Sequence, residues 1–595
     1  MKISSDTHLL ATDRHSLVSA GPGAGKTFWL LSHIKNVLTR SSKIHQNATI
    51  GVISYTNVAA DQLREELGPF ASRADISTIH SFLYRNVVRP YVHILRNTSG
   101  QYLVDPSRLD GHDEHHVNYA KFDQWLQEIN YRMVLRDAQQ SIALQEVLKR
   151  VRWEHADVPE RWNLTPSKTG FWLALWHKTQ ARLTHENIRS YKAQYWSDSV
   201  IDHDDVIYLA FRLLHDYPTL RVGLSARYPF LFVDEFQDTV PAQAQILRWF
   251  ADAGTTVVVI GDAEQSIFQF AGTSPVHFRD FYLPDMDKYE IANNRRSAKA
   301  IVDLLNHIRR DGLVQECTRN TGGAPIRLLV GTAVQAARSA RTLLNGASLI
   351  ILARNQKTVN ALIADSDTPA DDQWSKLLET DTKRSLFLKS VSMALVLARA
   401  GRLETSVAAL LKGIRHEDGV LKDPFKSTEI YSKLDRQAIA VTILEILLAK
   451  GCGLDSMTVR ASYLDLSERL SQQFSGLSMS RITRGKFAEL ADLITMKELI
   501  GTASNDDSDD VREARTVHKT KGKQADNVLV CLHSTHDDTR LRHLTNPTTP
   551  SDEEQRITYV AVSRARDTLL LAAPQLSHEE ELAVRALGIV VTRLD

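Results

Sequence analysis

The chain has 595 residues, of which 43% are apolar and 24% are charged, as in ordinary globular proteins. At roughly 150 residues per domain, this length predicts about four structural units. The 72 Lys and Arg residues balance the 71 Asp and Glu residues. This balance excludes a uniformly basic protein, so any surface for nucleic acid must be local.

Three features argue against an exported or membrane-bound protein. The cysteines at 317, 452 and 531 are too far apart in sequence to suggest a disulfide framework or a zinc site. The segment Met1–His15 is too polar for a signal peptide. No apolar run reaches the ~18 residues of a membrane span. We therefore expect a cytoplasmic protein without a membrane segment.

The first third of the chain changes character twice. Strand and helix patterns alternate over residues 1–85, which predicts a parallel sheet with crossover connections. Long helical patterns follow from about Arg89 to Asp198, and buried strands return at Phe230–Val233 and Thr255–Ile260. The helical stretch holds six of the nine tryptophans: Trp125, Trp153, Trp162, Trp172, Trp176 and Trp196. These rings could stack on bases, but we favour a core role because large rings on amphipathic helices are usually buried.

The second half repeats this plan. A strand-like segment at Ser348–Leu352 is followed by the polar stretch Asp365–Asp372 and by helical patterns that continue to about Ser504. The acidic Ser504–Asp510 is typical of a linker, and strand patterns return at Asn527–Leu532 and Thr568–Ala572. The sequence predicts an α/β protein with two sheet-bearing cores, each interrupted by a mainly helical insertion. The expected ranges are 1–89 and 199–285 around insertion 90–198, then 286–364 and 511–595 around insertion 365–510.

Ala20–Thr27 has the composition of a phosphate-binding loop. It follows an apolar strand and opens a helix, and its glycines allow backbone N–H groups to turn toward phosphates. The helix N-terminus adds a positive dipole end. Lys26 would reach the β- and γ-phosphates of a nucleoside triphosphate, and the Thr27 hydroxyl would bind Mg²⁺. The predicted nucleotide-binding residues of the loop are Ala20, Gly21, Gly23, Ala24, Gly25, Lys26 and Thr27.

Two carboxylates follow the apolar strand Phe230–Val233. Acids beside a buried strand are costly unless a cation or a proton transfer uses them. We expect Asp234 to hold Mg²⁺ and Glu235 to orient and deprotonate the attacking water. This pattern is common by itself, but behind a phosphate loop it indicates ATP hydrolysis.

Several further segments resemble motifs of the superfamily 1A DNA helicases of the UvrD, Rep and PcrA type, in the family's order. Those motifs are DExQD, GDxxQSIY, NYRS, TxHxxKG and YVAxTRA, and here they read Asp234–Asp238, Gly261–Phe268, Asn294–Ser297, Thr516–Gly522 and Tyr559–Ala565. The resemblance implies two RecA-like P-loop cores, called 1A and 2A, with insertions 1B and 2B. It also implies ATP and Mg²⁺ as ligands and 3′–5′ movement on single-stranded or tailed duplex DNA.

The resemblance assigns roles outside the loop. Gln265 would sense the γ-phosphate, and Arg296 and Arg564 would act as arginine fingers from the second core. An arginine finger is worth ~10³–10⁵ in rate in related NTPases. The segments Ile53–Ala60 and Thr78–Phe82 resemble the family's TFTNKAA and TxHxF motifs, which touch single-stranded DNA. The implied DNA contacts are Tyr55, Thr56, Asn57, Thr78, His80, Phe82, Phe270 and His518.

The sequence departs from the family where the base would be read. The family reads adenine with an N-terminal Gln and stacks it on the Tyr of NYRS, but Met1–Asp13 contains no Gln and Arg295 replaces the Tyr. We predict loosened base selectivity, with Arg295 stacking on the ring, or a substitute such as His8 or His15. Gln524 replaces the Glu of the family's KGLE motif, and it is expected to hydrogen-bond the nucleotide without acting as a base.

Two polar clusters allow more than one interpretation. The segment His112–His116 has a metal-like composition, but without a second cluster we expect a solvated loop. The acidic Ile201–Asp205 either caps a helix from Val206 or contacts DNA.

Two functions remain open. One is a helicase that separates duplex DNA. The other is a DNA-stimulated ATPase that activates a partner with little unwinding of its own. The size and domain plan resemble the helicase-like subunits of Gabija-type phage-defence systems, whose partner is an OLD-family nuclease.

Overall fold

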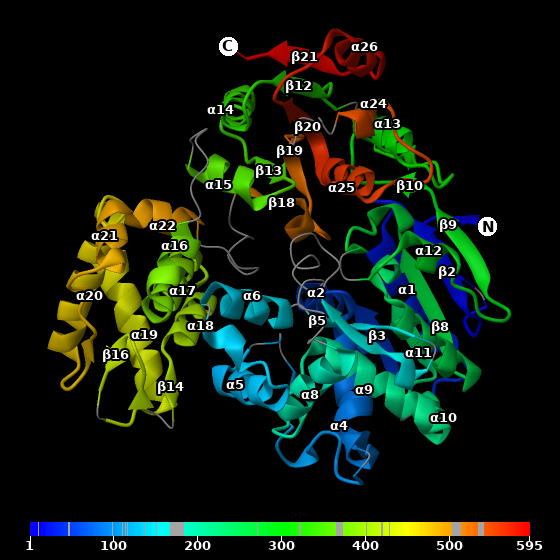
Figure 1. Cartoon of the computed structure of the whole chain (residues 1–595). Helices are drawn as coiled ribbons and strands as arrows, with labels where there is room; N and C mark the ends of the chain where they lie inside the picture. The colour runs from blue at the N-terminus through cyan, green and yellow to red at the C-terminus, as the bar shows by residue number, and fades with distance from the viewer. Residues whose placement is uncertain are drawn as a thin grey trace. The chain divides into compact units, whose positions relative to one another are not determined.

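The structure is a computed structural model of the whole chain. It describes residues 1–595 except 10, 46–47, 98, 110, 113–114, 116, 137, 150, 157, 167–183, 270–271, 320–322, 365–372, 400, 418–419, 428, 503–512, 534–540 and 595. The chain divides into two compact units, and Figure 1 labels their helices and strands. Unit 1 comprises Met1–Gly322 and Pro547–Tyr559, and unit 2 comprises Gly323–Asn546 and Val560–Asp595.

Unit 1 contains a seven-stranded sheet in which every neighbouring pair is parallel. In spatial order the strands are β1 (Lys2–Ile3), β9 (Asp287–Ile291), β2 (Ser16–Ala20), β8 (Thr256–Gly261), β7 (Phe230–Val233), β3 (Ile50–Ser54) and β4 (Ala74–Thr78). The first strands of the chain therefore form the predicted parallel sheet. Neighbouring parallel strands in the order β2-β8-β7-β3 must be linked by crossover connections, and helices form these connections.

Alternate side chains of each central strand enter different cores, because successive residues of a strand point to opposite faces. Phe232 and Val258 pack with Trp29 of α1 (Lys26–Arg40) and Leu63 of α2 (Asn57–Leu67). On the other face, strand residues such as Leu231 and Val259 pack with α9 (His203–Asp216) and α11 (Pro241–Asp252). The sheet is thus covered on both sides, as expected for a parallel sheet.

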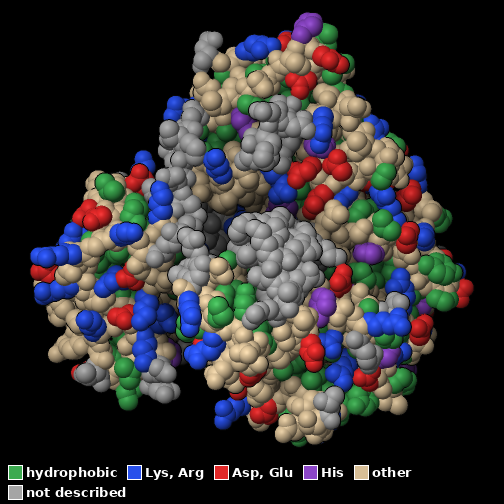
Figure 2. Space-filling model, viewed as in Figure 1, with side chains coloured by type: hydrophobic (Ala, Val, Ile, Leu, Met, Phe, Trp, Pro, Cys, Tyr) green, Lys and Arg blue, Asp and Glu red, His purple; other side chains and the backbone are tan. Residues whose placement is uncertain are grey.

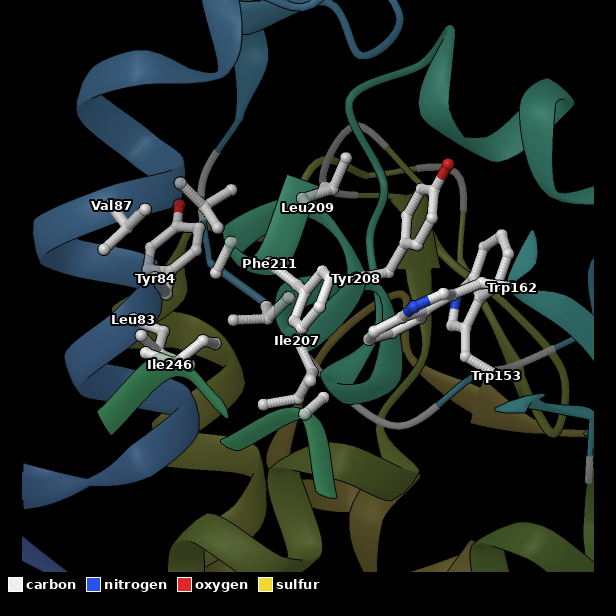
Figure 3. Close-up of a cluster of buried hydrophobic side chains, with 14 of the residues drawn as sticks. Leu83, Tyr84, Val87, Trp153, Trp162, Ile207, Tyr208, Leu209, Phe211 and Ile246 are labelled. Atoms are coloured by element: carbon white, nitrogen blue, oxygen red, sulfur yellow. The ribbon is translucent and has the colours of Figure 1, made fainter. Parts of the chain in front are cut away.

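Residues of the segment that was expected to be the first insertion belong to the second of these cores. The longer elements of this segment are α5 (Tyr119–Glu128), α6 (Ala138–Lys149), hairpin β5 (Val151–Glu154) and β6 (Asn163–Pro166), and α8 (His185–Trp196). Trp153 stacks on Tyr208 of α9, with ring centroids 3.9 Å apart and planes at 4°, and Figure 3 shows this contact beside Trp162. Trp125, Trp153, Trp162 and Trp196 are all buried. The core interpretation is therefore confirmed for these four, while Trp172 and Trp176 lie outside the described residues.

Unit 2 contains a second fully parallel sheet of six strands. In spatial order these are β18 (Ala514–Thr516), β13 (Ile350–Ala353), β19 (Ala525–Cys531), β20 (Ala565–Ala573), β12 (Arg327–Val330) and β21 (Val590–Arg593). Helices α14 (Ala333–Leu343) and α15 (Gln356–Ala364) contribute to the core on one face of this sheet. The strands predicted near residues 348, 527 and 568 are confirmed.

Residues of the segment that was expected to be the second insertion form a hydrophobic core of their own. Residues such as Phe387, Leu395, Ile443 and Leu466 form one cluster that contains no strand of the six-stranded sheet. The helices are α16 (Gln373–Thr380), α17 (Thr382–Arg399), α18 (Leu403–Gly413), α19 (Lys433–Leu448), α20 (Val459–Gln473), α21 (Lys486–Leu493) and α22 (Met496–Thr502). Two short antiparallel pairs accompany them: β14 (His416–Glu417) pairs with β15 (Val420–Leu421), and β16 (Phe425–Lys426) pairs with β17 (Ser478–Met479). The stretches 365–372 and 504–510, expected as breaks, lie outside the described residues.

Shorter elements complete the two units. They are α3 (Ile79–Leu83), α4 (Arg89–Tyr91), α10 (Pro218–Arg227), α12 (Pro275–Arg279), β10 (Asn293–Asn294), α13 (Lys299–Ile308), β11 (Glu316–Cys317), α24 (Arg542–Thr545), α25 (Glu553–Val562) and α26 (His578–Ala586). We expected the second core to begin at residue 286, whereas β10, α13 and β11 are grouped with the first sheet. No helix in the described part of the chain is long and apolar enough to cross a membrane. Both signs of charge are spread over the face shown in Figure 2, in keeping with the net charge of +1.

Candidate nucleotide site

Five neighbouring strands of unit 1 deliver the predicted site residues to one edge of the sheet. Ser19 of β2 pairs with Gly261 of β8, and Val233 of β7 pairs with Val259 of β8 and Ile53 of β3. Because all these strands are parallel and in register, the loops that follow them emerge together at the carboxyl edge. Those loops carry Ala20–Thr27, Asp234–Glu235, Gln265, Tyr55–Asn57 and, after β4, His80.

The phosphate loop has the backbone that its glycines predict. Gly23 and Gly25 have φ angles of 70° and 82°, in the left-handed region that favours glycine. A Cβ on Gly23 would also lie 2.6 Å from Asn294 Oδ1 and from the Cβ of Arg296. Lys26 Nζ donates to the Ala20 carbonyl at 3.4 Å and so folds back over its own loop. The loop opens α1, whose N-terminus faces the same edge.

Two amides from the β10–β11 region hold the loop from the side. Asn294 Nδ2 donates to the Pro22 carbonyl at 3.0 Å, and Gln315 Nε2 donates to the same carbonyl at 2.9 Å. Both side chains are buried, and a Cβ on Gly21 would meet the Gln315 amide at 2.5 Å. Sequence reasoning did not identify Gln315, because it lies outside every motif and its partner is 293 positions away.

The acid pair sits where β7 ends. Asp234 N donates to the Ile53 carbonyl at 2.8 Å, and Glu235 N donates to Asp234 Oδ1 at 2.9 Å. Glu235 has a φ of 52°, a conformation that costs free energy for a residue with a side chain. Gln237 Nε2 donates to Glu235 Oε2. The strained backbone and this bond fix the direction of the Glu235 carboxylate.

Gln265 is tied to the same hydrogen-bond network. Its Nε2 donates to Asp262 Oδ2 at 2.9 Å, and Asp262 N donates to Gln237 Oε1 at 3.0 Å. Gln265 and Asp262 are both buried. One network of hydrogen bonds therefore connects Gln265, Asp262, Gln237 and Glu235 and orients their side chains.

The two predicted finger arginines belong to different units. Arg296 is grouped in unit 1 with the phosphate loop, which differs from the expectation that it comes from the second core. The reason is the β10–β11 pair, which hydrogen-bonds the loop. Arg564 lies in unit 2 and is buried. Its Nε, Nη1 and Nη2 donate to the Val560 carbonyl at 3.0 Å, the Lys523 carbonyl at 3.1 Å and Ser563 Oγ at 2.8 Å.

The corner that is predicted to face the base contains two exposed side chains, those of Arg295 and Asp6. Arg295 pairs with Asp6 and donates to Ser4 Oγ at 3.3 Å, while its own N donates to the Gly23 carbonyl at 2.9 Å. The hydrogen bond from Arg295 lowers the pKa of the Asp6 carboxyl. His15 cannot be the substitute base reader, because its Nδ1 accepts from Val257 N at the opposite, amino edge of the sheet. His8 is exposed.

Thr27 and Asp234 could hold a magnesium ion. Mg²⁺ is usually bound through one or two protein oxygens, substrate phosphates and water. Among the described residues no group of three His, Cys, Asp or Glu side chains could hold a metal by itself. Two protein oxygens beside a phosphate loop therefore fit this ion.

The segments after β3 and β4 contain exposed side chains and hydroxyl groups that cap helices. Tyr55 is half-exposed and stacks on Phe268, with ring centroids 5.1 Å apart. Thr56 Oγ1 accepts from Ala59 N and caps α2, and Thr78 Oγ1 accepts from Ser81 N and caps α3. Asn57 is exposed as the first residue of α2.

Phe82 departs from the predicted DNA-facing set. Its side chain is 1% exposed and packs against Tyr228, with ring centroids 5.0 Å apart. Because the side chain turns into the core, this position is a packing position in the structure. Phe270 lies outside the described residues. In unit 2, His518 is partly buried in the turn Val517–Thr520, and Gln524 is exposed.

His80 belongs to a cluster of histidines. Its ring lies 5.4 Å from the ring of His203 and 6.5 Å from that of His112. Burial lowers the pKa of His80 to about 3, so the ring is neutral at physiological pH. His112 Nδ1 and His203 Nδ1 share a hydrogen bond of 2.7 Å, and His115 Nε2 lies 3.0 Å from the Tyr191 hydroxyl. The solvated-loop interpretation is therefore wrong for His112 and His115, which pack against α8 and α9; residues 113, 114 and 116 lie outside the described residues.

The acidic segment before α9 caps that helix. Asp202 Oδ1 accepts from Asp205 N at 2.9 Å, and Asp205 Oδ2 accepts from Asp202 N at 3.1 Å, which makes a reciprocal capping box. The buried Lys192 ammonium pairs with both carboxylates. The capping interpretation is confirmed, with the helix beginning at His203 instead of Val206.

Comparison with known proteins agrees with this geometry. Residues 4–283 match the UvrD/REP helicase N-terminal domain, and residues 411–575 match the UvrD-like helicase C-terminal domain. The chain is 26% identical over 330 residues to the Gabija protein GajB of Bacillus cereus (strain HuB5-5). It is 25% identical over 313 residues to the ATP-dependent DNA helicase PcrA of Bacillus subtilis (strain 168) and 24% identical over 300 residues to the ATP-dependent DNA helicase Rep of Escherichia coli (strain K12).

These alignments are partial. They cover 50%, 50% and 49% of this chain and 47%, 38% and 40% of the three relatives. The chain thus spans about half the length, or less, of the curated relatives it matches. The two domain matches together extend over most of the sequence and include the phosphate loop, the acid pair, Gln265 and Arg564. On these matches, the chain belongs to the UvrD/Rep helicase family.

Proposed function

We propose that the chain is an ATP-driven motor that moves 3′ to 5′ on single-stranded DNA and separates duplex DNA. The observation that carries this proposal is the carboxyl edge of the unit 1 sheet. There, in-register parallel strands bring a phosphate loop, an acid pair and Gln265 next to the exposed segment that holds Tyr55 and Asn57. A site for hydrolysis lies beside a polar and aromatic surface that could follow a single strand.

The chemistry follows from the residues at this edge. Lys26 and the loop N–H groups would bind the triphosphate, and Thr27 and Asp234 would hold Mg²⁺, which neutralises charge on the phosphates. Glu235, fixed by Gln237, would take the proton of the attacking water. Gln265 would contact the γ-phosphate, and Arg296 and Arg564 would stabilise charge on the transferring group.

A second function has specific support. We propose as the alternative a DNA-stimulated ATPase that activates a partner nuclease of the OLD family in anti-phage defence, with little unwinding of its own. The support is the 26% identity to a Gabija protein over half of this chain. Both functions use the same ATP site, so they differ in output and not in hydrolysis.

A strand-displacement assay separates the two functions. The purified chain would be mixed with a 3′-tailed duplex, a 5′-tailed duplex or a blunt duplex, with ATP and Mg²⁺, and the Glu235→Gln variant would serve as control. Unwinding of the 3′-tailed duplex alone supports the motor and its polarity. ATP hydrolysis that rises with DNA but leaves every duplex intact supports the alternative. Absence of hydrolysis with any DNA contradicts both.

A further inference from the structure

Arg309 is a buried arginine outside every sequence motif. It follows the last residue of α13, and its own N donates to the Leu305 carbonyl at 3.0 Å. The side chain is 2% exposed. A buried guanidinium is costly unless its donors are used, so its partners indicate its purpose.

The guanidinium bridges three groups. Nη1 donates to the Tyr559 hydroxyl oxygen at 2.9 Å, and Nη2 donates to Asp262 Oδ1 at 3.2 Å. Asp311 accepts from Nε at 2.8 Å and from Nη2 at 2.7 Å, which locks the plane of the guanidinium. Arg309 is therefore a rigid connector between Asp262 and Tyr559, with Asp311 as its anchor.

Asp262 is the junction on one side of this connector. Its second carboxylate oxygen accepts from Gln265 Nε2 at 2.9 Å, and its N donates to Gln237 Oε1 at 3.0 Å. Gln237 in turn holds Glu235. If a bound γ-phosphate draws the Gln265 amide away, Asp262 loses one of its two side-chain partners and depends more on Arg309.

Helix α25 is on the other side of the connector. Its first half belongs to unit 1 and is held there by Arg556 Nε, which donates to the Ser266 carbonyl at 2.7 Å, and by Gln555 Nε2, which donates to the Ile308 carbonyl at 2.9 Å. Tyr559 is the last residue of this stretch, and the chain continues from Val560 into unit 2. Arg564 follows Tyr559 by five positions.

We propose that Arg309 is a positioning residue that couples the nucleotide-sensing turn Asp262–Ser266 to helix α25. When nucleotide occupies the phosphate site, the hydrogen bonds of Asp262 change. Because Arg309 bonds both Asp262 and Tyr559, the position of Tyr559 and of the following segment up to Arg564 then changes as well. The inference rests on the proposed role of Gln265 in contacting the γ-phosphate. If the network around Arg309 had only a structural role, its contribution to the stability of unit 1 would be the same with and without nucleotide.

The Tyr559→Phe variant tests the coupling by removing one hydroxyl from a buried site. Tyr228→Phe is the matched control, because Tyr228 is equally buried in unit 1 and its hydroxyl binds Asp75 and Asn86, away from Asp262. Hydrogen–deuterium exchange would be measured on the full chain with and without a non-hydrolysable ATP analogue and Mg²⁺. One readout is the loop peptide over residues 20–27, and the other is the α25 peptide over residues 553–562.

In the wild type and in Tyr228→Phe, the analogue should slow exchange of both peptides, in α25 by roughly tenfold, a usual size for coupling between sites. In Tyr559→Phe the loop should remain protected while the α25 effect falls to less than about twofold. Equal α25 protection in both variants would overturn the proposal. A wild type without loop protection would refute the nucleotide site itself, and the coupling with it.

Arg309→Lys provides a second variant in case the loss of the hydroxyl disturbs folding. It keeps the positive charge but loses the planar fork that binds Asp262, Asp311 and Tyr559 together. The same selective loss of α25 protection is expected, and adding Tyr559→Phe to it should cause little further loss, since both changes break one connection. Fully additive losses would contradict a shared connection.

Discussion

The phosphate side and the base side of the loop are built in different ways. On the phosphate side, Gln265 is 3% exposed, Asn294 is 0% exposed and Gln315 is 3% exposed. On the base side, the side chains of Arg295 and Asp6 are 45% and 56% exposed. Displacing a buried hydrogen-bonded group costs about 1–3 kcal/mol for each partner that is left unsatisfied, whereas breaking an exposed ion pair costs little, because water solvates both charges.

This difference suggests that the residues for ATP hydrolysis and the residues for base recognition are held in different ways. Gln265 and the two amides that hold the phosphate loop, those of Asn294 and Gln315, are fixed by buried hydrogen bonds. Arg295 and Asp6, which are predicted to lie nearest to the base, form a solvated ion pair that can exchange partners at small cost. We therefore expect substitutions on the phosphate side to have large effects on rate and affinity, and substitutions on the base side to have small effects on preference.

The largest effect should come from Glu235→Gln. The amide cannot accept the proton of the attacking water, so kcat for ATP should fall by about 10²–10⁴, the usual contribution of general acid–base catalysis. Phosphate release in the presence of single-stranded DNA measures it. Glu290→Gln, an exposed carboxylate on the same sheet, is the matched control. A Glu235→Gln rate within threefold of wild type would show that the acid pair is not the catalytic site.

Gly23→Ala should mainly weaken nucleotide binding. The alanine would have to adopt a φ of 70°, and its Cβ would lie 2.6 Å from Asn294 Oδ1. The loop must then move, and we expect KM for ATP to rise about tenfold or more, since strain of this kind costs of order 1–3 kcal/mol. Gly68→Ala is the control, because Gly68 has a φ of 59° but no neighbour within 4 Å of a Cβ. Equal KM values for the two variants would contradict a packed loop.

On the predicted base side, the wild type should hydrolyse ATP, GTP and CTP with kcat/KM values within roughly tenfold of one another, because the Arg295 side chain expected to face the base is exposed and lies in a solvated ion pair. Arg295→Ala should change these ratios by a few-fold while leaving kcat nearly unchanged. Lys299→Ala, which breaks an exposed pair with Asp303, is the control. A wild type with strict preference for ATP would contradict this difference between the residues for hydrolysis and the residues for base recognition.

The smallest effect should be a change of protein stability with pH that is caused by His33, on the buried face of α1. Burial, with a contribution from His8, lowers the pKa of His33 to about 4. The folded state therefore binds fewer protons than the unfolded state, whose histidine titrates near 6.5, so stability is lost as pH falls from 6.5 toward 4. At pH 5.5 the loss should be about 1 kcal/mol.

Urea unfolding at pH 7.5 and 5.5 measures this contribution. The ring of His33 stacks on Trp29 at 5.0 Å, and neither ring nitrogen has a hydrogen-bond partner within the described part of the chain. His33→Phe should keep the packing and reduce the pH dependence, whereas His45→Phe on the exposed surface should not. An unchanged dependence in His33→Phe would show that His33 does not contribute to it.

The sequence by itself determined the parts that depend on neighbours along the chain. The loop, the acid pair and Gln265 each follow an apolar strand, and a strand followed by glycines or acids has a meaning that needs no distant residue. The parallel sheets follow from the alternation of strands and helices. The helix cap at Asp202 was one of two interpretations of the acidic segment, beside a DNA contact, because a cap also depends only on neighbouring residues.

Tertiary structure decided the parts that depend on which element packs on which. Phe82 and the four described tryptophans between residues 90 and 198 turned inward because they pack in one hydrophobic core together with residues of the sheet and its helices. Gln315 and Arg309 acquired roles from Pro22 and Tyr559, which lie 293 and 250 positions away. Such contacts have no local signal, because burial and hydrogen-bond geometry arise only when distant segments are brought together.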